Sequence, residues 1–353
     1  MFKLRIESPD SFAIEYAANV LKKEGLVAFP TETVYGLGGI VWSERATRRI
    51  FEVKGRPSDN PLIVHISSME MLERVASRIP EEAYMLIKKT WPGPLTLILH
   101  KSSEIPRIVT GGLETVAVRM PSHPVALELI NQTNEPVAAP SANLSGRPSP
   151  TSGRHVVNDL LGRIEVILDA GETLYGIEST VVNILTDPPV LLRPGAVPVE
   201  EIEKILGRRI VVPGFARGVE AVEKALSPGM KYRHYAPAAK VVLIEASSYE
   251  RTCLSKLADI VRVFIASKTL EKPCVAIPVD SLENYERISV KIFTMGDRNN
   301  IYEVAKSLFS VLRAADEEKC NLLIVEGIPE EGLGLAVMNR LRKAASERFI
   351  VEC

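Results

Sequence analysis

Apolar residues along the first two hundred positions recur in two alternating patterns, one typical of helices and one of buried strands. Short apolar runs bounded by proline, glycine or polar residues predict strands at residues 26–30, 61–66, 95–100, 115–120, 136–140, 165–170, 179–185 and 189–194. Amphipathic segments predict helices at residues 11–23, 43–55, 123–133 and 153–161. We therefore expect an α/β domain, residues 1–210, built on one large, twisted, partly parallel sheet.

The predicted helix at 43–55 has clear end signals. Ser43 suits the N-cap, where its hydroxyl can accept a hydrogen bond from the first turn. Gly55 follows the last periodic position and can adopt the left-handed conformation that ends many helices. The segment KGRPSDNP, residues 54–61, is therefore expected in the loop that leaves this helix.

The pattern breaks between residues 211 and 239, where prolines and glycines recur every few positions. We interpret this stretch as a linker with one short helix at 220–226. Residues 240–353 again alternate between strand-like and helical segments, which predicts a smaller, Rossmann-like α/β domain. A linker of this length is usually functional or disordered.

Composition argues against several classes of protein. The 353 residues hold 43 Lys and Arg against 44 Asp and Glu, so binding of nucleic acid by bulk charge is not expected, although a local basic groove stays possible. The first residues do not resemble a signal peptide, and no run of about 18 apolar residues predicts a membrane span. The four cysteines, Cys253, Cys274, Cys320 and Cys353, have no paired spacing, so we expect no disulfide framework, no zinc site and a reducing cytoplasm.

Four cations stand where an anion could bind. Lys54 and Arg56 lie in the proline-rich loop, and a solvated helix end would also explain them. Arg119 and Arg193 each end an apolar strand and precede a proline, and a charged strand end often faces a pocket. Together they favour an anion site over separate surface ion pairs. No complete phosphate-binding glycine motif occurs, so side-chain cations and loop donors would have to hold a triphosphate.

Three segments are rich in hydroxyl groups. The segment 29–39 carries Thr31, Thr33 and Tyr35 before a glycine cluster, and it is either a plain turn or a donor loop that a ligand approaches closely. The segment 140–152 is dense in Ser, Asn, Gly and Pro and could be a plain loop. The segment 176–183 brings Glu178, Ser179 and Thr180 to the start of a predicted strand.

Covalent catalysis is not expected. The five histidines show no metal-ligand spacing and are best explained as structural, with His65 the most interesting because it ends a strand. The first domain has neither a GxSxG nucleophile turn nor a cysteine.

Seven motifs occur in one order over residues 10–205: FPTETVYGLGG, KGRPSDNPL, WPGPLTLIL, VAVRMPSHP, PSANLSGRPSPT, GIESTVV and LLRPG. Together they resemble the threonylcarbamoyl-AMP synthase family, whose catalytic domain is called YrdC-like. SPGMKYRHYAP (227–237) and GLGLAVMNRLRKAA (332–345) resemble the long, two-domain form of that family. The resemblance therefore covers nearly the whole chain.

The resemblance implies a twisted α/β sheet with a concave, positively charged groove. It implies an enzyme that makes L-threonylcarbamoyladenylate and pyrophosphate from L-threonine, bicarbonate and ATP, with Mg²⁺ carried mainly by phosphate oxygens and water. A downstream transferase complex would then pass the threonylcarbamoyl group to tRNA, next to the anticodon. Binding of tRNA by this chain itself is possible but not required.

The resemblance also implies roles for individual residues. Lys54 and Arg56 would be the catalytic cations. The residues that would contact ATP are Lys54, Arg56, Asn60, Thr115, Ser141, Asn143, Ser149, Arg193 and Tyr235. Those that would hold threonine are Thr33, His65, Arg119, Ser179 and the main chain of Ala139. Tyr235 is favoured over Tyr232 as the linker tyrosine that reaches the site, and residues 227–237 are expected to fold over it as a lid.

Three other hypotheses remain at the level of sequence. The cationic groove could hold structured RNA, although no aromatic stacking platform accompanies it. An O-carbamoyltransferase is a second alternative, although such proteins carry acylphosphatase and zinc-finger regions that this chain lacks. Residues 240–353 show no catalytic constellation and could form a structural or docking unit.

Overall fold

A computed structural model of the chain describes residues 1–3, 11–221, 225–227, 235–267, 272–286 and 288–353. The chain forms two compact units. The first unit comprises residues 1–145, 149–216 and 220–232, and the second comprises 146–148, 217–219 and 233–353.

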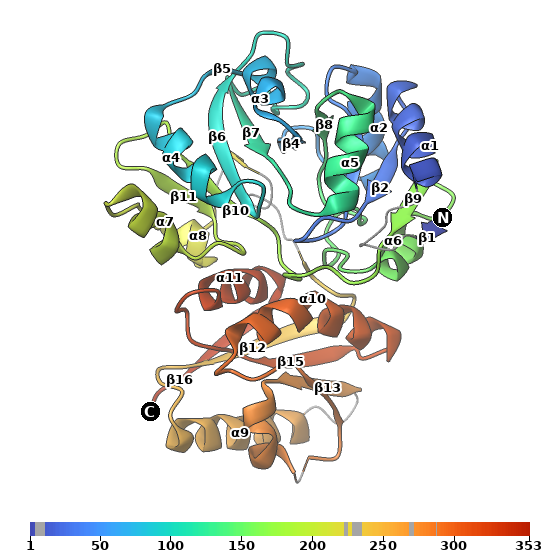
Figure 1. The fold of residues 1–353 in the computed structure, drawn as a ribbon. Coiled ribbons are helices and arrows are strands. Elements are labelled where there is room, and N and C mark those ends of the chain that lie inside the picture. The colour runs from blue at the N-terminus through green and yellow to red at the C-terminus, as the bar shows by residue number, and fades with distance from the viewer. Residues whose placement is uncertain (4–10, 222–224, 228–234, 268–271, 287) are drawn as a thin grey trace. The chain divides into compact units, whose positions relative to one another are not determined.

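The first unit is built on one mixed sheet, as the strand pattern predicts (Figure 1). Its strand order is β1-β9-β2-β3-β8-β4-β7-β6-β10-β11, and β5 pairs with the outer part of β6. The strands are β1 (Phe2–Lys3), β2 (Val27–Phe29), β3 (Gly36–Ile40), β4 (Ile63–His65), β5 (Ala76–Arg78), β6 (Leu95–Lys101), β7 (Thr115–Arg119), β8 (Val137–Ala138), β9 (Val166–Asp169), β10 (Thr180–Asn183) and β11 (Val190–Arg193). Parallel pairs such as β4–β7 and antiparallel pairs such as β6–β7 occur side by side.

The helices of the first unit are α1 (Ser11–Lys22), α2 (Glu44–Lys54), α3 (Met69–Val75), α4 (Glu81–Thr90), α5 (Pro124–Thr133), α6 (Gly153–Leu160), α7 (Val199–Leu206) and α8 (Gly214–Arg217). The end signals of α2 act as predicted. The Ser43 hydroxyl accepts a hydrogen bond from the Ala46 amide at 3.0 Å, and Gly55 has a φ of 61°. These caps fix where the chain leaves α2, and Lys54 is its last residue.

The glycine cluster after residue 35 is a strand, so the expected loop at this point is wrong. Gly36 to Ile40 form β3, which pairs antiparallel with β2 and β8. A Cβ atom on Gly38 would lie 2.7 Å from a Val137 methyl and 2.8 Å from the Phe29 ring. The glycines therefore leave room for side chains packed on this strand, which outweighs the low strand propensity of glycine.

The short helix expected at 220–226 is also not found as predicted. Residues 222–224 lie outside the described residues, and the described residues 220, 221, 225 and 226 are not helical. A four-residue helix, α8, occurs earlier, at Gly214–Arg217.

The second unit has a fully parallel sheet with the order β14-β13-β15-β12-β16. Its elements are β12 (Lys240–Ala246), α9 (Arg251–Ala266), β13 (Pro273–Ile277), the 3₁₀ helix η1 (Val279–Tyr285), β14 (Lys291–Thr294), α10 (Ile301–Glu317), β15 (Leu322–Glu326), α11 (Gly334–Ala344) and β16 (Glu347–Val351). Helices α10 and α11 lie on one face of this sheet and α9 lies on the other (Figure 1). The predicted second α/β sheet, in residues 240–353, is thus confirmed.

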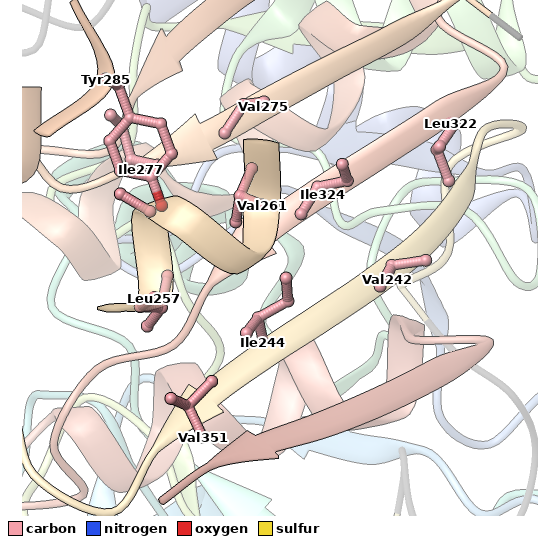
Figure 2. Close-up of a cluster of buried hydrophobic side chains, with 11 residues drawn as sticks. Val242, Ile244, Leu257, Val261, Val275, Ile277, Tyr285, Leu322, Ile324 and Val351 are labelled. Carbon is pink, nitrogen blue, oxygen red and sulfur yellow. The ribbon is translucent and has the colours of Figure 1, made fainter. Parts of the chain in front are cut away.

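Figure 2 shows the core between α9 and this sheet. Alternate residues of three strands point into it: Val242 and Ile244, Val275 and Ile277, and Leu322 and Ile324. Leu257 and Val261, one helical turn apart on α9, cover them.

Among the described residues, no helix of the chain is both long enough and apolar enough to cross a bilayer.

All four cysteines are paired, so the expectation of no disulfide framework is wrong. Cys253 bonds to Cys353, and Cys274 bonds to Cys320. Cys274 lies on β13, and Cys320 lies just before β15, its neighbour in the sheet. Sequence spacing could not reveal the Cys274–Cys320 pair because strand adjacency, rather than proximity in the chain, brings these two residues together.

Candidate active site

Two polar side chains end neighbouring strands of the first unit. His65 is the last residue of β4, Arg119 is the last residue of β7, and the two are Cα partners in the parallel ladder. Cross-strand partners point to the same face of a sheet, so the imidazole and the guanidinium share one environment. Both side chains are buried.

Arg119 is held on three sides. Its Nε donates to the Gly93 main-chain oxygen at 3.1 Å, and its Nη1 donates to the Thr33 hydroxyl at 2.9 Å. Its Nη2 lies 2.6 Å from Oε1 of Glu32, in an ion pair whose side chains are only 3% and 4% exposed. The guanidinium is therefore fixed in position, facing the loop that follows β2.

Glu32 is a site residue that the sequence analysis missed. Within the described residues, neither of its carboxylate oxygens accepts a hydrogen bond of good geometry, although Oε1 contacts Arg119. Burial of a carboxylate is costly unless it is paired, so an incompletely satisfied one marks a functional position. The available signal was a charged residue between Thr31 and Thr33, both of which are buried.

His65 is neutral in the folded chain. Burial, and secondarily the charge of Arg119, lowers the pKa of its imidazole to about 3. Its ring lies edge-on to Phe29, with centroids 6.1 Å apart, and Nδ1 has no hydrogen-bond partner among the described residues. A neutral imidazole nitrogen of this kind can accept or donate one hydrogen bond to a ligand.

A second cluster joins β6, β10 and β11. Ser179 and Thr96 share a hydrogen bond of 2.7 Å between their hydroxyl groups. Arg193, the last residue of β11, donates from Nη2 to the Ser179 hydroxyl at 3.0 Å and to its main-chain oxygen at 2.9 Å. The sequence analysis missed Thr96, whose signal was one polar residue within the apolar run of β6.

Lys54 is buried, so a solvated helix end does not explain it. Its Nζ donates to the main-chain oxygens of Ser141 at 2.5 Å and Asn143 at 2.6 Å. The main-chain oxygen of Lys54 accepts from the Ser145 amide at 2.8 Å. The helix end and the 140–152 loop are thus joined, which brings together two motifs about 90 residues apart.

Arg56 and Asn60 lie in the loop that leaves α2, and the Arg56 side chain contacts the main chain of Asn60. The guanidinium of Arg56 donates to the main-chain oxygens of Asn60 and Pro61, at 3.1 to 3.4 Å. Asn60 is fully buried, yet neither side-chain amide atom has a hydrogen-bond partner among the described residues. Thr115 is the first residue of β7, and Ala117 of the same strand pairs with Ile63 in β4. Because the two strands are parallel, Thr115 lies beside the loop that precedes β4.

The 140–152 loop is packed against β3 and β4. The Ala139 amide donates to the Ile63 oxygen at 2.9 Å, which leaves the Ala139 carbonyl as the group it can offer a ligand. Ser141 bridges to Gly36, and the buried Ser149 donates its hydroxyl proton to Glu178 at 2.6 Å. This loop is therefore ordered by its own contacts.

Tyr235 belongs to the second unit, and Tyr232 lies outside the described residues. The Tyr235 backbone has a φ of 66°, which is uncommon for a non-glycine residue. Its ring stacks on Phe309 at 5.3 Å between centroids, and the guanidinium of Arg340 lies 5.6 Å from its centre. Most of the expected lid, residues 228–234, is likewise outside the described part.

The first unit thus holds four buried cations, Lys54, Arg56, Arg119 and Arg193. It also holds three polar side chains that lack full pairing among the described residues, Glu32, Asn60 and His65. Such a set can bind anions and orient polar substrates. Within the described residues, no group of three or more histidines, cysteines or carboxylates gathers as a metal would require.

Two family models together match most of the chain. A model described as telomere recombination, Sua5_yciO_yrdC, matches residues 19–195. A model described as the C-terminal domain of threonylcarbamoyl-AMP synthase matches residues 197–346.

Individual proteins match over nearly the full length. The threonylcarbamoyl-AMP synthase of Pyrococcus abyssi is 50% identical and is covered to 97%, with 98% of this chain aligned. The enzyme of the same name from Bacillus subtilis is 44% identical and is covered to 94%, with 96% of this chain aligned. The crystal structure of P. abyssi Sua5 complexed with L-threonine superposes with a TM-score of 0.91 at 48% identity, covering 99% of both chains.

Proposed function

The chain belongs to the threonylcarbamoyl-AMP synthase family, in its two-domain form, and we propose on that premise that it makes L-threonylcarbamoyladenylate. The substrates are L-threonine, bicarbonate and ATP, and the second product is pyrophosphate. The observation that carries this proposal is the relative solved with L-threonine, which shares the fold of this chain over its whole length.

The threonine end of the site comprises the pair of strand ends and the loop after β2. Arg119 binds the α-carboxylate, because a guanidinium matches a carboxylate in charge and shape. Thr33, His65, Ser179 and the carbonyl of Ala139 supply the remaining polar contacts. His65 suits this role because its neutral ring and its unpaired Nδ1 allow one directed hydrogen bond without a second charge.

The ATP end comprises the loop after α2 and the loops beside it. Lys54, Arg56 and Arg193 offset the charge of the polyphosphate and of the leaving pyrophosphate. Asn60, Thr115, Ser141, Asn143 and Ser149 supply hydrogen bonds, and the unsatisfied amide of Asn60 supports its assignment. We expect these cations to line a concave, positively charged groove in the first unit.

The chemistry needs positioning and positive charge, since both nucleophiles come from the substrates. The threonine amine attacks the bicarbonate carbon to give a carbamate and water. A carbamate oxygen then attacks the α-phosphorus of ATP, and pyrophosphate leaves. Mg²⁺ enters with ATP, held mainly by phosphate oxygens and water.

A lid formed by residues 227–237, with Tyr235 contacting ATP, stays a prediction, since residues 228–234 lie outside the described residues. The second unit is a Rossmann-like domain. The product is passed in the cytoplasm to a transferase that modifies tRNA beside the anticodon.

Pyrophosphate release from ATP tests the proposal, measured with and without L-threonine and bicarbonate, and with serine and glycine as control amino acids. Release that requires both threonine and bicarbonate supports it. Release that is indifferent to both substrates contradicts it. Salt-dependent tRNA binding without ATP turnover would favour the alternative of an RNA-binding module.

A further inference from the structure

Glu32 is a buried carboxylate of the site that has no role among the substrate contacts proposed above. It is 3% exposed, and Oε2 has neither a hydrogen bond nor an ion pair among the described residues. Three titratable groups face it: Arg119, His123 and Tyr175. Burial lowers the pKa of His123, which favours its neutral form, so Arg119 is the one cation beside Glu32 within the described residues.

The donors of Arg119 define what can bind beside this pair. Nε is engaged with Gly93, one Nη1 proton with Thr33, and Nη2 faces Glu32. One N–H on each terminal nitrogen remains available for a ligand carboxylate. An anion alone would meet a guanidinium whose charge Glu32 already balances, whereas a zwitterion presents a matching cation to Glu32.

We propose that Glu32 binds the α-ammonium group of the amino-acid substrate and accepts a proton from it. This inference rests on the proposed function, because it assigns the substrate amine to a specific acceptor in that site. The Arg119–Glu32 pair then recognises both charges of an α-amino acid, with the carboxylate on the guanidinium and the ammonium on Oε2 of Glu32.

The proton balance of the first step follows from this placement. The ammonium group gives one proton to Glu32 and becomes a neutral amine with a free electron pair. The amine nitrogen bonds to the bicarbonate carbon, the C–OH bond breaks, and the hydroxide leaves as water with the second amine proton. Glu32 is left protonated, and the carbamate carries one negative charge.

The test compares two ligands on two proteins by calorimetry. The ligands are L-threonine and its 2-hydroxy analogue, 2,3-dihydroxybutanoate, which keeps the carboxylate and the side-chain hydroxyl but lacks the ammonium charge. In Glu32→Gln we expect threonine to bind about 10- to 100-fold more weakly, because one partner of a buried charge pair is lost. We expect the analogue to bind at least as tightly as before, since Arg119 is no longer neutralised. At saturating threonine, pyrophosphate release should fall about 100-fold, because the proton acceptor is gone.

Two further variants complete the experiment. Glu32→Asp keeps the charge and should recover part of the threonine affinity, which also keeps the test valid if the glutamine variant does not fold. Glu165→Gln is the matched control, since Glu165 is a carboxylate of the same unit that pairs with Arg49 and is absent from the site.

Equal weakening of both ligands in Glu32→Gln, or unchanged threonine binding, would overturn the role of Glu32. Failure of the unaltered protein to bind threonine would instead count against the proposed function.

Discussion

The ammonium group of Lys54 lies 2.6 Å from the main-chain oxygen of Asn143, which is 89 residues further along the chain. A charged donor at a helix end thus positions the loop that follows β8. Because Lys54 is buried, its charge is little screened by solvent.

Lys54→Met should therefore weaken both ATP use and the fold. We expect kcat/KM for ATP to fall by about 100-fold, because a cation beside the polyphosphate is lost. We expect the free energy of unfolding to fall by about 1–3 kcal/mol, because the main-chain oxygens of Ser141 and Asn143 lose their donor. Pyrophosphate release and urea unfolding measure the two effects. A variant that matches the parent protein in both would show that Lys54 has neither role.

Arg56→Ala should weaken ATP use and also lower the stability of the fold. Arg56 donates to two buried main-chain oxygens of its own loop, so we expect ATP turnover to fall by about 100-fold and the free energy of unfolding to fall by about 1–3 kcal/mol. Arg48→Ala is the matched control, since Arg48 lies on α2 with its side chain 63% exposed and pairs with Glu44. Normal turnover of Arg56→Ala would refute the assignment.

The buried His65 should make the folded chain sensitive to acid. Its pKa of about 3 in the folded state lies below the ordinary value of 6.5. Between these values the unfolded chain binds a proton that the folded chain does not, so the free energy of unfolding falls as the pH falls, by about 1.4 kcal/mol per pH unit for this one group.

Urea unfolding between pH 6.5 and pH 4.5 measures this component as the difference between the parent protein and His65→Gln. His100→Gln is the control, since His100 is exposed on β6. Identical pH slopes in the parent protein and His65→Gln would contradict a neutral, buried His65.

The two disulfides should stabilise the second unit alone, because the first unit contains no cysteine. Replacing Cys274 and Cys320 by serine should lower the free energy of unfolding of the second unit by about 2–4 kcal/mol, since the bridge closes a long loop in the unfolded chain. Thermal unfolding with and without a reductant provides the measurement, and the transition of the first unit is the internal control. If neither the serine substitutions nor the reductant shifts the unfolding transition of the second unit, the proposed stabilisation by the disulfides is contradicted.

Much of the fold is predictable because local signals and tertiary packing agree. Ser43 bounds α2 through a side-chain hydrogen bond, and Gly55 bounds it through a left-handed backbone conformation that glycine adopts readily. The strands ending at Arg119 and Arg193 are short apolar runs, and the structure confirms that both arginines end their strands. Both arginines are buried, like most residues of the strands that they end.

The remainder depends on contacts that sequence does not encode locally. β3 is mostly glycine, and it forms because Phe29 and Val137 occupy the space that its side chains would fill. Cys274 and Cys320 meet because β13 and β15 are neighbours in the sheet. Glu32 lies between two threonines in a loop. It is recognised as a site residue only through its ion pair with Arg119, which lies on a strand 87 positions later.

The central claim is tested most directly by incubating the chain with ATP, L-threonine and carbon-13-labelled bicarbonate and identifying the nucleotide product by mass spectrometry. We expect threonylcarbamoyl-AMP that carries one labelled carbon, formed together with pyrophosphate. AMP or ADP without a labelled carbamoyl group would contradict the account.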